Sequence, residues 1–69
     1  MSEASEVFKR LVWVAKEFGY QVTVHADWIS VAREGRVQDS KSSANFTRGV
    51  SGYEQAIKWL QTKAQRGEL

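Results

Sequence analysis

Residues 20–37 carry the pattern that most constrains the fold, because two stretches within them alternate apolar and polar side chains with a period of two. This alternation predicts a β-hairpin that reverses around Ala26 and Asp27 and continues into a third strand. One side of the hairpin would carry Tyr20, Val22, Val24, Ile29 and Val31, and the other would carry Gln21, Thr23, His25, Trp28 and Ser30. A sheet with one apolar face packs helices on that face and leaves the other face to water or a partner.

The third strand is expected after a short loop at residues 33–35, in which Gly35 takes the left-handed conformation. A three-residue loop places Val37 opposite Val31 on the apolar side of the sheet, whereas a two-residue loop would turn Val37 to the polar side. Burial of Val37 favours the three-residue loop.

Residues 39–49 lose the alternation and are rich in Ser, Asn and Gly. We interpret them as a long loop with Phe46 as its apolar anchor. A short edge strand at residues 44–47 is the alternative.

Residues 2–18 are predicted to form an amphipathic helix. Its apolar stripe comprises Ala4, Val7, Phe8, Leu11, Val14, Ala15 and Phe18. Ser2 or Ser5 suits the N-cap, and Gly19 suits the left-handed position that follows the last turn. Residues 11–15 alone are also typical of a strand, but the stripe and the caps agree on a helix.

The last element begins at residues 51–54, whose sequence Ser-Gly-Tyr-Glu has the form of a capping box. In this interpretation Ser51 is the N-cap, and the Glu54 side chain reaches back to it. The apolar stripe of this second helix comprises Tyr53, Ala56, Ile57, Leu60 and Ala64. Gly67, directly after Arg66, predicts its end.

These elements predict an α+β fold in which a helix, a three-stranded antiparallel sheet and a helix follow one another (αβββα), with both helices on one sheet face. A chain of this length buries only about 60% of its unfolded surface, so residues 1–69 are expected to form a single domain with one core. The predicted core contains Leu11, Val22, Val24, Ile29, Val31, Ile57 and Leu60. The sequence has no cysteine, which excludes a disulfide framework and a thiolate metal site.

The order of the elements resembles the topology of the double-stranded-RNA-binding domain over nearly the whole chain. In that family a run of lysines opens the second helix, and a Gly-Pro-x-His type of loop follows the first strand. The corresponding places here read Ser-Gly-Tyr-Glu at residues 51–54 and Ala26-Asp27, and Lys58 is the first basic residue of the second helix. We therefore transfer none of that family's binding residues to this chain.

Ten Lys and Arg against eight Asp and Glu give a formal net charge of +2 and a pI near 9.2. This balance permits binding to a polyanion without requiring it. The first residues are acidic, and the longest apolar run, residues 11–15, is too short for a signal peptide or a membrane span. We therefore expect a soluble, cytoplasmic protein that does not contact a membrane.

Trp13 is an unusual residue for a helix face that the apolar stripe leaves to solvent. On a helical projection it lies nearly opposite Leu11, among Lys9, Lys16, Glu6 and Glu17. A tryptophan flanked by lysines suits the anchor of a binding surface. In the alternative, a neighbouring loop covers Trp13 and only the edge of its indole meets water. Trp59 flanks the stripe of the second helix and is expected to pack against the first helix.

Trp28 and His25 are expected to face each other across the hairpin on its polar side, as a small aromatic patch between Thr23 and Ser30. Cross-strand pairing alone would account for this patch, and a single histidine is more often structural than catalytic. The candidate partner-binding residues are Trp13, Lys9, Lys16, Trp28 and His25.

Basic residues are denser at residues 33–48 than elsewhere. The candidate nucleic-acid-binding residues are Arg33, Arg36, Lys41 and Arg48. Residues 48–52 place an arginine and two glycines at the start of a predicted helix, which is a geometry that suits an anion. Neither a phosphate-loop nor a dinucleotide-binding pattern is present.

Catalysis has little support in the sequence, which has no cysteine, one histidine, no paired carboxylates at a recognisable spacing and no metal-ligand cluster. We expect a non-catalytic protein without a cofactor or a metal. The leading hypothesis is a small regulatory or adaptor module that binds a protein partner. The alternative is a nucleic-acid-binding module that uses the basic residues of 33–48.

Overall fold

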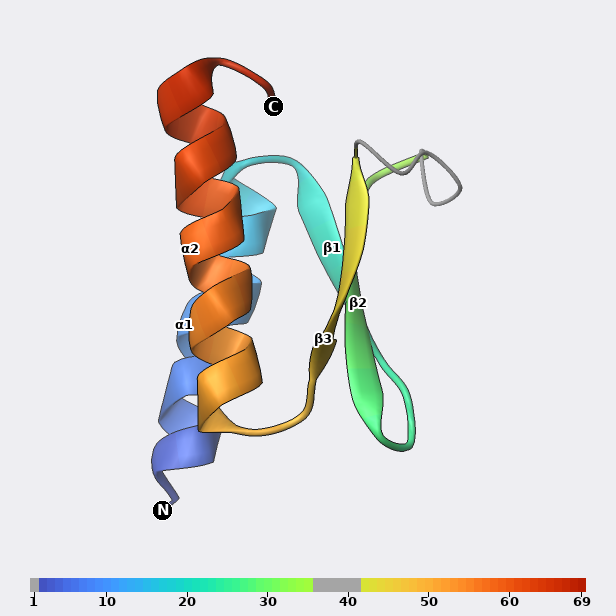
Figure 1. Cartoon of the computed structure of the whole chain (residues 1–69), viewed down its shortest axis with the longest axis vertical. Coiled ribbons are helices and arrows are strands. Elements are labelled where there is room, and N and C mark those ends of the chain that lie inside the picture. Colours follow the sequence, from blue (N-terminus) through green and yellow to red (C-terminus); the bar gives the residue numbers. More distant parts are fainter. Residues whose placement is uncertain (1, 36–41) are drawn as a thin grey trace.

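Both helices lie on one face of a three-stranded antiparallel sheet, and no described element covers the opposite face (Figure 1). The computed structural model describes residues 2–35 and 42–69. Along the chain the elements are α1 (Glu3–Glu17), β1 (Tyr20–Val24), β2 (Trp28–Arg33), β3 (Ser43–Thr47) and α2 (Val50–Arg66). The strands are ordered β1, β2, β3, with α1 against β1, α2 against β3 and the helices against each other. The predicted α+β fold of order αβββα is confirmed.

The first hairpin has the register that the alternation predicts. Val22 lies opposite Val31 and Val24 lies opposite Ile29, so the chain reverses around Ala26. Because side chains alternate along a strand, this register turns the apolar set toward the helices and the polar set away from them. Ile29 and Val31 of β2 are completely buried as a result.

The third strand lies later in the sequence than we predicted. β3 pairs with β2 so that Ala44 lies opposite Val31. Val31 thus has Val22 on one side and Ala44 on the other, and the prediction that Val37 pairs with it is wrong. Val37 itself belongs to residues 36–41, which lie outside the described part of the chain.

The alternative prediction, a short edge strand at residues 44–47, is confirmed, since β3 spans Ser43–Thr47. Phe46, opposite Ile29, packs its ring edge-to-face on Trp59 of α2, with the ring centroids 5.9 Å apart. An aromatic ring buries more apolar area than a valine, which favours pairing this later segment with β2. Gly35, at the end of the preceding turn, has the expected positive φ of 79°.

One core lies between the sheet and the two helices. Its buried residues are Leu11, Ala15, Tyr20, Ile29, Val31, Tyr53, Ala56, Ile57 and Leu60. This set contains every predicted core residue except Val22, which is partly buried against it, and Val24. Val24 is 49% exposed, so its prediction as a core residue is wrong. It is the last residue of β1, where a hollow beside α1 replaces packed side chains.

The ends of α1 are those that the sequence predicts. Ser2 is the N-cap, and its Oγ accepts a hydrogen bond from the Ser5 amide at 3.3 Å. Phe18 is the C-cap, and Gly19 follows it with a positive φ of 79°. Gly19 thereby turns the chain from α1 directly into β1.

Helix α2 begins earlier than the capping box predicts. Gly49 is the N-cap, with φ of 132°, and no side chain caps the helix. Ser51 is therefore not the N-cap. It lies in the first turn, where its Oγ accepts a hydrogen bond from Gln55 Nε2 at 3.4 Å. The physical reason is the positive φ of Gly49, which glycine adopts readily and which leads the chain from β3 straight into the helix. The end of α2 is as predicted, with Gly67 in the left-handed conformation.

Candidate functional site

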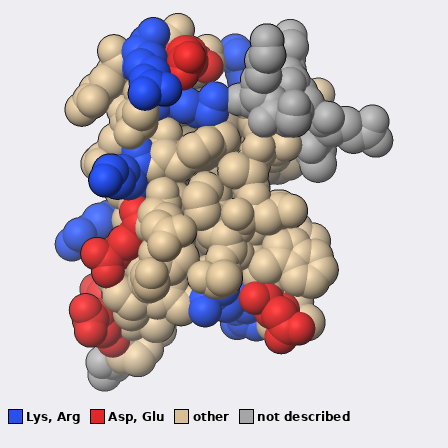
Figure 2. Space-filling view, in the orientation of Figure 1, with Lys and Arg blue, Asp and Glu red and all other residues tan. Residues whose placement is uncertain are grey.

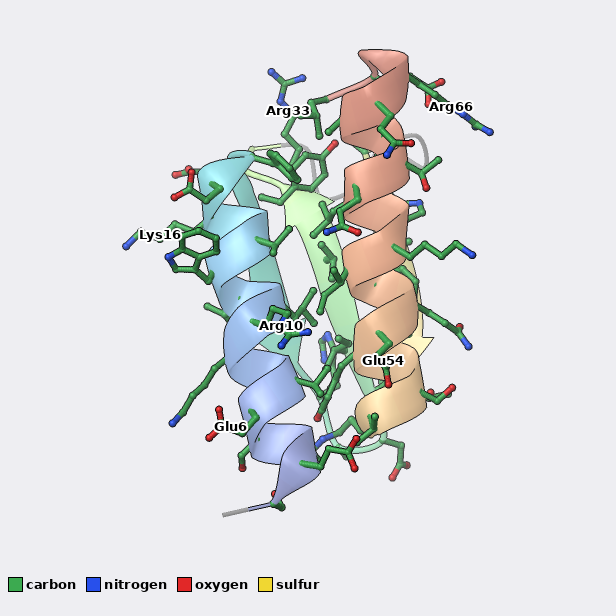
Figure 3. All side chains as sticks on the ribbon, turned by 90° about the vertical axis from the view of Figure 1, so that its left-hand side faces the viewer. Glu6, Arg10, Lys16, Arg33, Glu54 and Arg66 are labelled. Carbon is green, nitrogen blue, oxygen red and sulfur yellow. The ribbon has the colours of Figure 1, made fainter. Side chains whose placement is uncertain are left out.

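Trp13 is the first of the candidate residues, and its side chain is 65% exposed on the outer face of α1. No described segment covers it, so the alternative of a covering loop does not hold for the described chain. Lys9 and Lys16 are also exposed, and their spacing from Trp13 on the helix places all three on neighbouring turns. Figure 3 shows Lys16 and Glu6 pointing away from α1 into solvent.

Trp28 and His25 form the second candidate surface, on the sheet face that the helices leave free. Their rings stack with centroids 4.5 Å apart and an interplanar angle of 15°. The prediction that these two side chains face each other across the hairpin is confirmed. Trp28 remains 43% exposed, so the stack offers one aromatic surface to the outside.

A row of hydrogen bonds crosses the same face, from the residue that follows β1 through β2 to β3. Ser30 Oγ donates to Asn45 Oδ1 at 3.0 Å, and His25 Nε2 lies 3.0 Å from Ser30 Oγ. Because the Ser30 hydroxyl proton is directed to Asn45, the Ser30 oxygen is free to accept from His25. Asn45 was missed at the sequence level, since its side chain joins this face only if residues 43–47 form the third strand.

The partner-binding candidates therefore divide into two groups. Trp13, Lys9 and Lys16 belong to α1, whereas Trp28 alternates with the buried Ile29 along β2 and so lies, with the stacked His25, on the sheet face opposite to the helices. The sheet and its core separate the two groups. A partner that binds one group on a flat surface does not reach the other.

The nucleic-acid candidates are also separated. Arg33 is the last residue of β2, and Arg48 follows the β3 residue that pairs with the first residue of β2. At about 3.3 Å per residue, the strand from Trp28 to Arg33 spans roughly 16 Å, and Arg48 lies one residue beyond Thr47, the partner of Trp28. Figure 3 shows Arg33 at the end of the molecule where α2 finishes. Arg36 and Lys41 lie outside the described residues.

Arg48 has a structural role at the tip of the first hairpin. Its Nη1 donates to the carbonyl of Ala26 at 3.0 Å and to the carbonyl of His25 at 3.3 Å. These bonds join the segment before α2 to the turn between β1 and β2. The guanidinium is still exposed, so its remaining N–H groups can meet a ligand.

An open hollow of about 370 Å³ lies beside the N-terminal half of α1, and we call it the α1 hollow. It is lined by Ala4, Ser5, Phe8, Lys9, Val24, Arg48 and Tyr53. Phe8 and Tyr53 meet edge-to-face with ring centroids 5.1 Å apart and form its apolar wall. Lys9 and Arg48 supply two cations, and none of the lining residues is acidic.

A second open hollow, of about 430 Å³, lies between α2 and β3, and we call it the α2 hollow. It is lined by Phe46, Gln55, Lys58, Trp59, Thr62, Lys63, Arg66 and Glu68. Its three cations face one carboxylate, and the Lys63 ammonium lies 4.9 Å from the centroid of the Trp59 ring. The spacing of Lys58, Thr62 and Arg66, four residues apart, is the sequence signal that places them on one side of α2.

Trp59 also packs differently from the prediction, which placed it against the first helix. Its ring meets the ring of Tyr20 of β1 edge-to-face, with the centroids 5.8 Å apart. It meets the ring of Phe46 of β3 in the same way, with the centroids 5.9 Å apart. Both partners belong to the sheet. Trp59 faces the strands because it lies on the side of α2 that packs on β3.

Figure 2 shows basic side chains mainly over the upper part of the helical side and acidic side chains mainly over its lower part, with a broad uncharged area across the centre of this face. In residues 2–35 and 42–69 there is no group of three or more His, Cys, Asp or Glu that could hold a metal ion. Neither α1 nor α2 is long and apolar enough to cross a bilayer. Comparisons of the chain with protein-family models, with curated proteins and with solved structures found no match.

Proposed function

We propose that this domain is a cytoplasmic, non-catalytic module that binds a protein partner through the outer face of α1, with Trp13 as the anchor. The observation that carries the proposal is the 65% exposure of Trp13, which is the highest among the exposed large apolar side chains of the described residues. Tryptophan in water exposes a large apolar surface, and it is among the residues most enriched at the energetic centres of interfaces.

The surroundings of Trp13 also suit a protein interface. Val12, the preceding residue, is 40% exposed and adds apolar surface beside Trp13 around the circumference of the helix. Lys9 and Lys16 are exposed one turn to either side. Interfaces commonly have an apolar centre and a charged or polar rim, so the partner is expected to offer an apolar pocket with carboxylates beside it.

The test is to isolate the partner by crosslinking to the tagged protein in cells and to measure its affinity for purified variants by calorimetry. Trp13→Ala should weaken binding at least about 30-fold, which corresponds to about 2 kcal/mol for a hot-spot tryptophan. Trp28→Ala is the matched control, because it removes an exposed tryptophan from the opposite face and should change the affinity less than threefold. If Trp28→Ala releases the partner and Trp13→Ala does not, the interface is the open sheet face.

The α2 hollow favours a second candidate function, a nucleic-acid-binding module. Lys58, Lys63 and Arg66 can neutralise phosphates, and the aromatic ring of Trp59 lies among them. Binding of this kind should weaken steeply with added salt, because each neutralised phosphate releases counterions. Fluorescence titration of single- and double-stranded DNA and RNA at two salt concentrations measures this. Salt-sensitive binding that survives Trp13→Ala would favour this function over the first.

A further inference from the structure

β1 forms one edge of the sheet, and the backbone polar groups of three of its five residues point away from β2. At one end of the β1–β2 ladder the His25 amide donates across to the second strand at 2.8 Å, and at the other end the Gly19 carbonyl accepts from the chain beyond β2 at 3.3 Å. In an antiparallel pair, residues that exchange hydrogen bonds alternate with residues that do not. The amides and carbonyls of Tyr20, Val22 and Val24 therefore point to the open edge, where no described strand lies.

This edge lacks the features that usually prevent a further strand from pairing. Natural edge strands are commonly protected by lysine, by proline or by a bulge. β1 reads Tyr-Gln-Val-Thr-Val, without a charge or a proline, and its pairing with β2 runs through five consecutive residues without a bulge. The edge of β1 is thus competent to receive another extended chain.

The α1 hollow opens at the Val24 end of this edge. The same side of α1 that carries Phe8 and Lys9 borders the hollow, so helix and edge strand form two walls of one site. The hollow offers apolar contact through Phe8 and Tyr53 and positive charge through Lys9 and Arg48. A chain paired with β1 would place alternate side chains on the helix side of the sheet, toward these residues.

We propose that the edge of β1 receives an extended, acidic segment of a partner protein as a fourth strand. The backbone of this segment pairs with the outward groups of Val22 and Val24, an apolar side chain enters the α1 hollow, and a carboxylate lies beside Lys9 and Arg48. This inference rests on the proposed protein-binding function and names the chemistry of the partner. Lys9 joins the two surfaces, because it lines the hollow and lies one turn before Trp13 on α1.

The charge of the α1 hollow favours an acidic partner over a second copy of this chain. A second copy that paired through its own β1 would bring a strand without any carboxylate. Lys9 and Arg48 would then gain no counter-charge from the paired strand. An acidic segment supplies that charge and the hydrogen bonds together.

In the experiment, ten-residue peptides are first selected from a random phage-displayed library on the immobilised protein. The affinity of a selected peptide, labelled with a fluorophore, is then measured by anisotropy. Selected peptides should contain Asp or Glu and alternate apolar with polar residues. Val24→Pro removes an outward amide without removing a bond to β2, and it should weaken binding at least tenfold. Val24→Thr is the matched control, because it keeps the amide and the branched shape, and it should stay within threefold.

A second pair of variants tests the charge without touching the strand. Lys9→Glu should weaken peptide binding at least tenfold. Lys58→Glu, an equal charge change on α2, should keep the affinity within threefold of the wild type. By NMR, the Val22 and Val24 amides should become protected from hydrogen exchange when the peptide is bound. Folding of each variant is verified by circular dichroism.

Three results would overturn the inference: no selected peptide, selected peptides without acidic residues, or equal binding by Val24→Pro and Val24→Thr. Dimerisation of the free protein that Val24→Pro abolishes would show that a second copy occupies the edge instead. The proposed function fails separately, since it depends on Trp13→Ala and the crosslinked partner. Loss of that partner with Trp13→Ala, together with normal binding by Val24→Pro, would retain the function and reject the strand pairing.

Discussion

Gly52 of α2 lies so close to Thr47 of β3 that a β-carbon on the glycine would overlap the Thr47 carbonyl oxygen. The glycine is buried in the first turn of α2, next to the exposed Ser51. The absence of a side chain at this one position lets the start of α2 rest directly on the last residue of the sheet.

Gly52→Ala should therefore destabilise the protein, although alanine normally favours a helix over glycine by roughly 1 kcal/mol. The added methyl group meets backbone rather than a flexible side chain, so the helix must shift. We expect a loss of about 1–3 kcal/mol in the free energy of unfolding, measured with urea. A variant as stable as the wild type would mean that α2 can move away from β3 without loss.

The two serines at the helix starts should respond differently to replacement by alanine. Ser2→Ala removes the hydroxyl that caps α1 and should cost about 0.5–1 kcal/mol. Ser51→Ala removes no cap and should stay within about 0.5 kcal/mol of the wild type. Urea unfolding of both variants side by side measures the difference. An equal loss at the two positions would restore Ser51 as a cap.

Leu60→Ala should be among the most destabilising single changes, because the Leu60 side chain is completely buried between α2 and the rest of the core. Removal of its branched end should cost about 2–5 kcal/mol. Val24→Ala is the control, since Val24 is half exposed, and it should cost less than about 1 kcal/mol. Thermal and urea unfolding report both values. A small loss in the free energy of unfolding for Leu60→Ala would mean that α2 does not pack on the core as described.

Tyr20→Phe should stabilise the protein. The Tyr20 hydroxyl is buried and has no hydrogen-bond partner among the described residues. An unsatisfied buried hydroxyl costs free energy, so its removal should raise the free energy of unfolding by about 1 kcal/mol. Tyr53→Phe is the control, because the Tyr53 hydroxyl is not a buried group without a partner. This variant should change the free energy of unfolding little. Destabilisation by Tyr20→Phe would reveal a partner for the hydroxyl.

Trp13→Ala should leave the fold intact, because two thirds of the Trp13 side chain already lies in water. We expect a change of less than about 0.5 kcal/mol in the free energy of unfolding. Trp59→Ala, which removes the ring between Tyr20 and Phe46, should cost at least about 2 kcal/mol. Unfolding curves of the two variants test this contrast. A large loss at Trp13 would mean that binding defects of this variant reflect misfolding.

The local patterns of the sequence were sufficient for the two helices and the first hairpin. Period-two alternation determined that Val22 faces Val31, because a shift by one residue would turn every apolar side chain into solvent. The third strand could not be placed in this way. Val37 and Phe46 both offered an apolar anchor, and the choice depends on the ring of Trp59, which comes from an element far along the chain.

The binding surfaces were less accessible to sequence reasoning for a related reason. A helical projection shows that Trp13 faces outward, but it cannot show that Trp28 lies on the opposite side of the molecule. The α1 hollow combines residues from α1, β1, α2 and the segment before α2, so no spacing in the sequence indicates it. Ser51 failed as a cap because the conformation of Gly49, two residues earlier, decides where the helix begins.

The bonds from Arg48 to the carbonyls of Ala26 and His25 link the α1 hollow to the stacked rings on the far side of the sheet. A carboxylate in the hollow would compete for the same guanidinium, and the hairpin tip would relax when that guanidinium turns toward it. Trp28 sits at this tip, stacked on His25. The contribution of Trp28 to the fluorescence of the three tryptophans should therefore change when a ligand binds in the α1 hollow without touching Trp28.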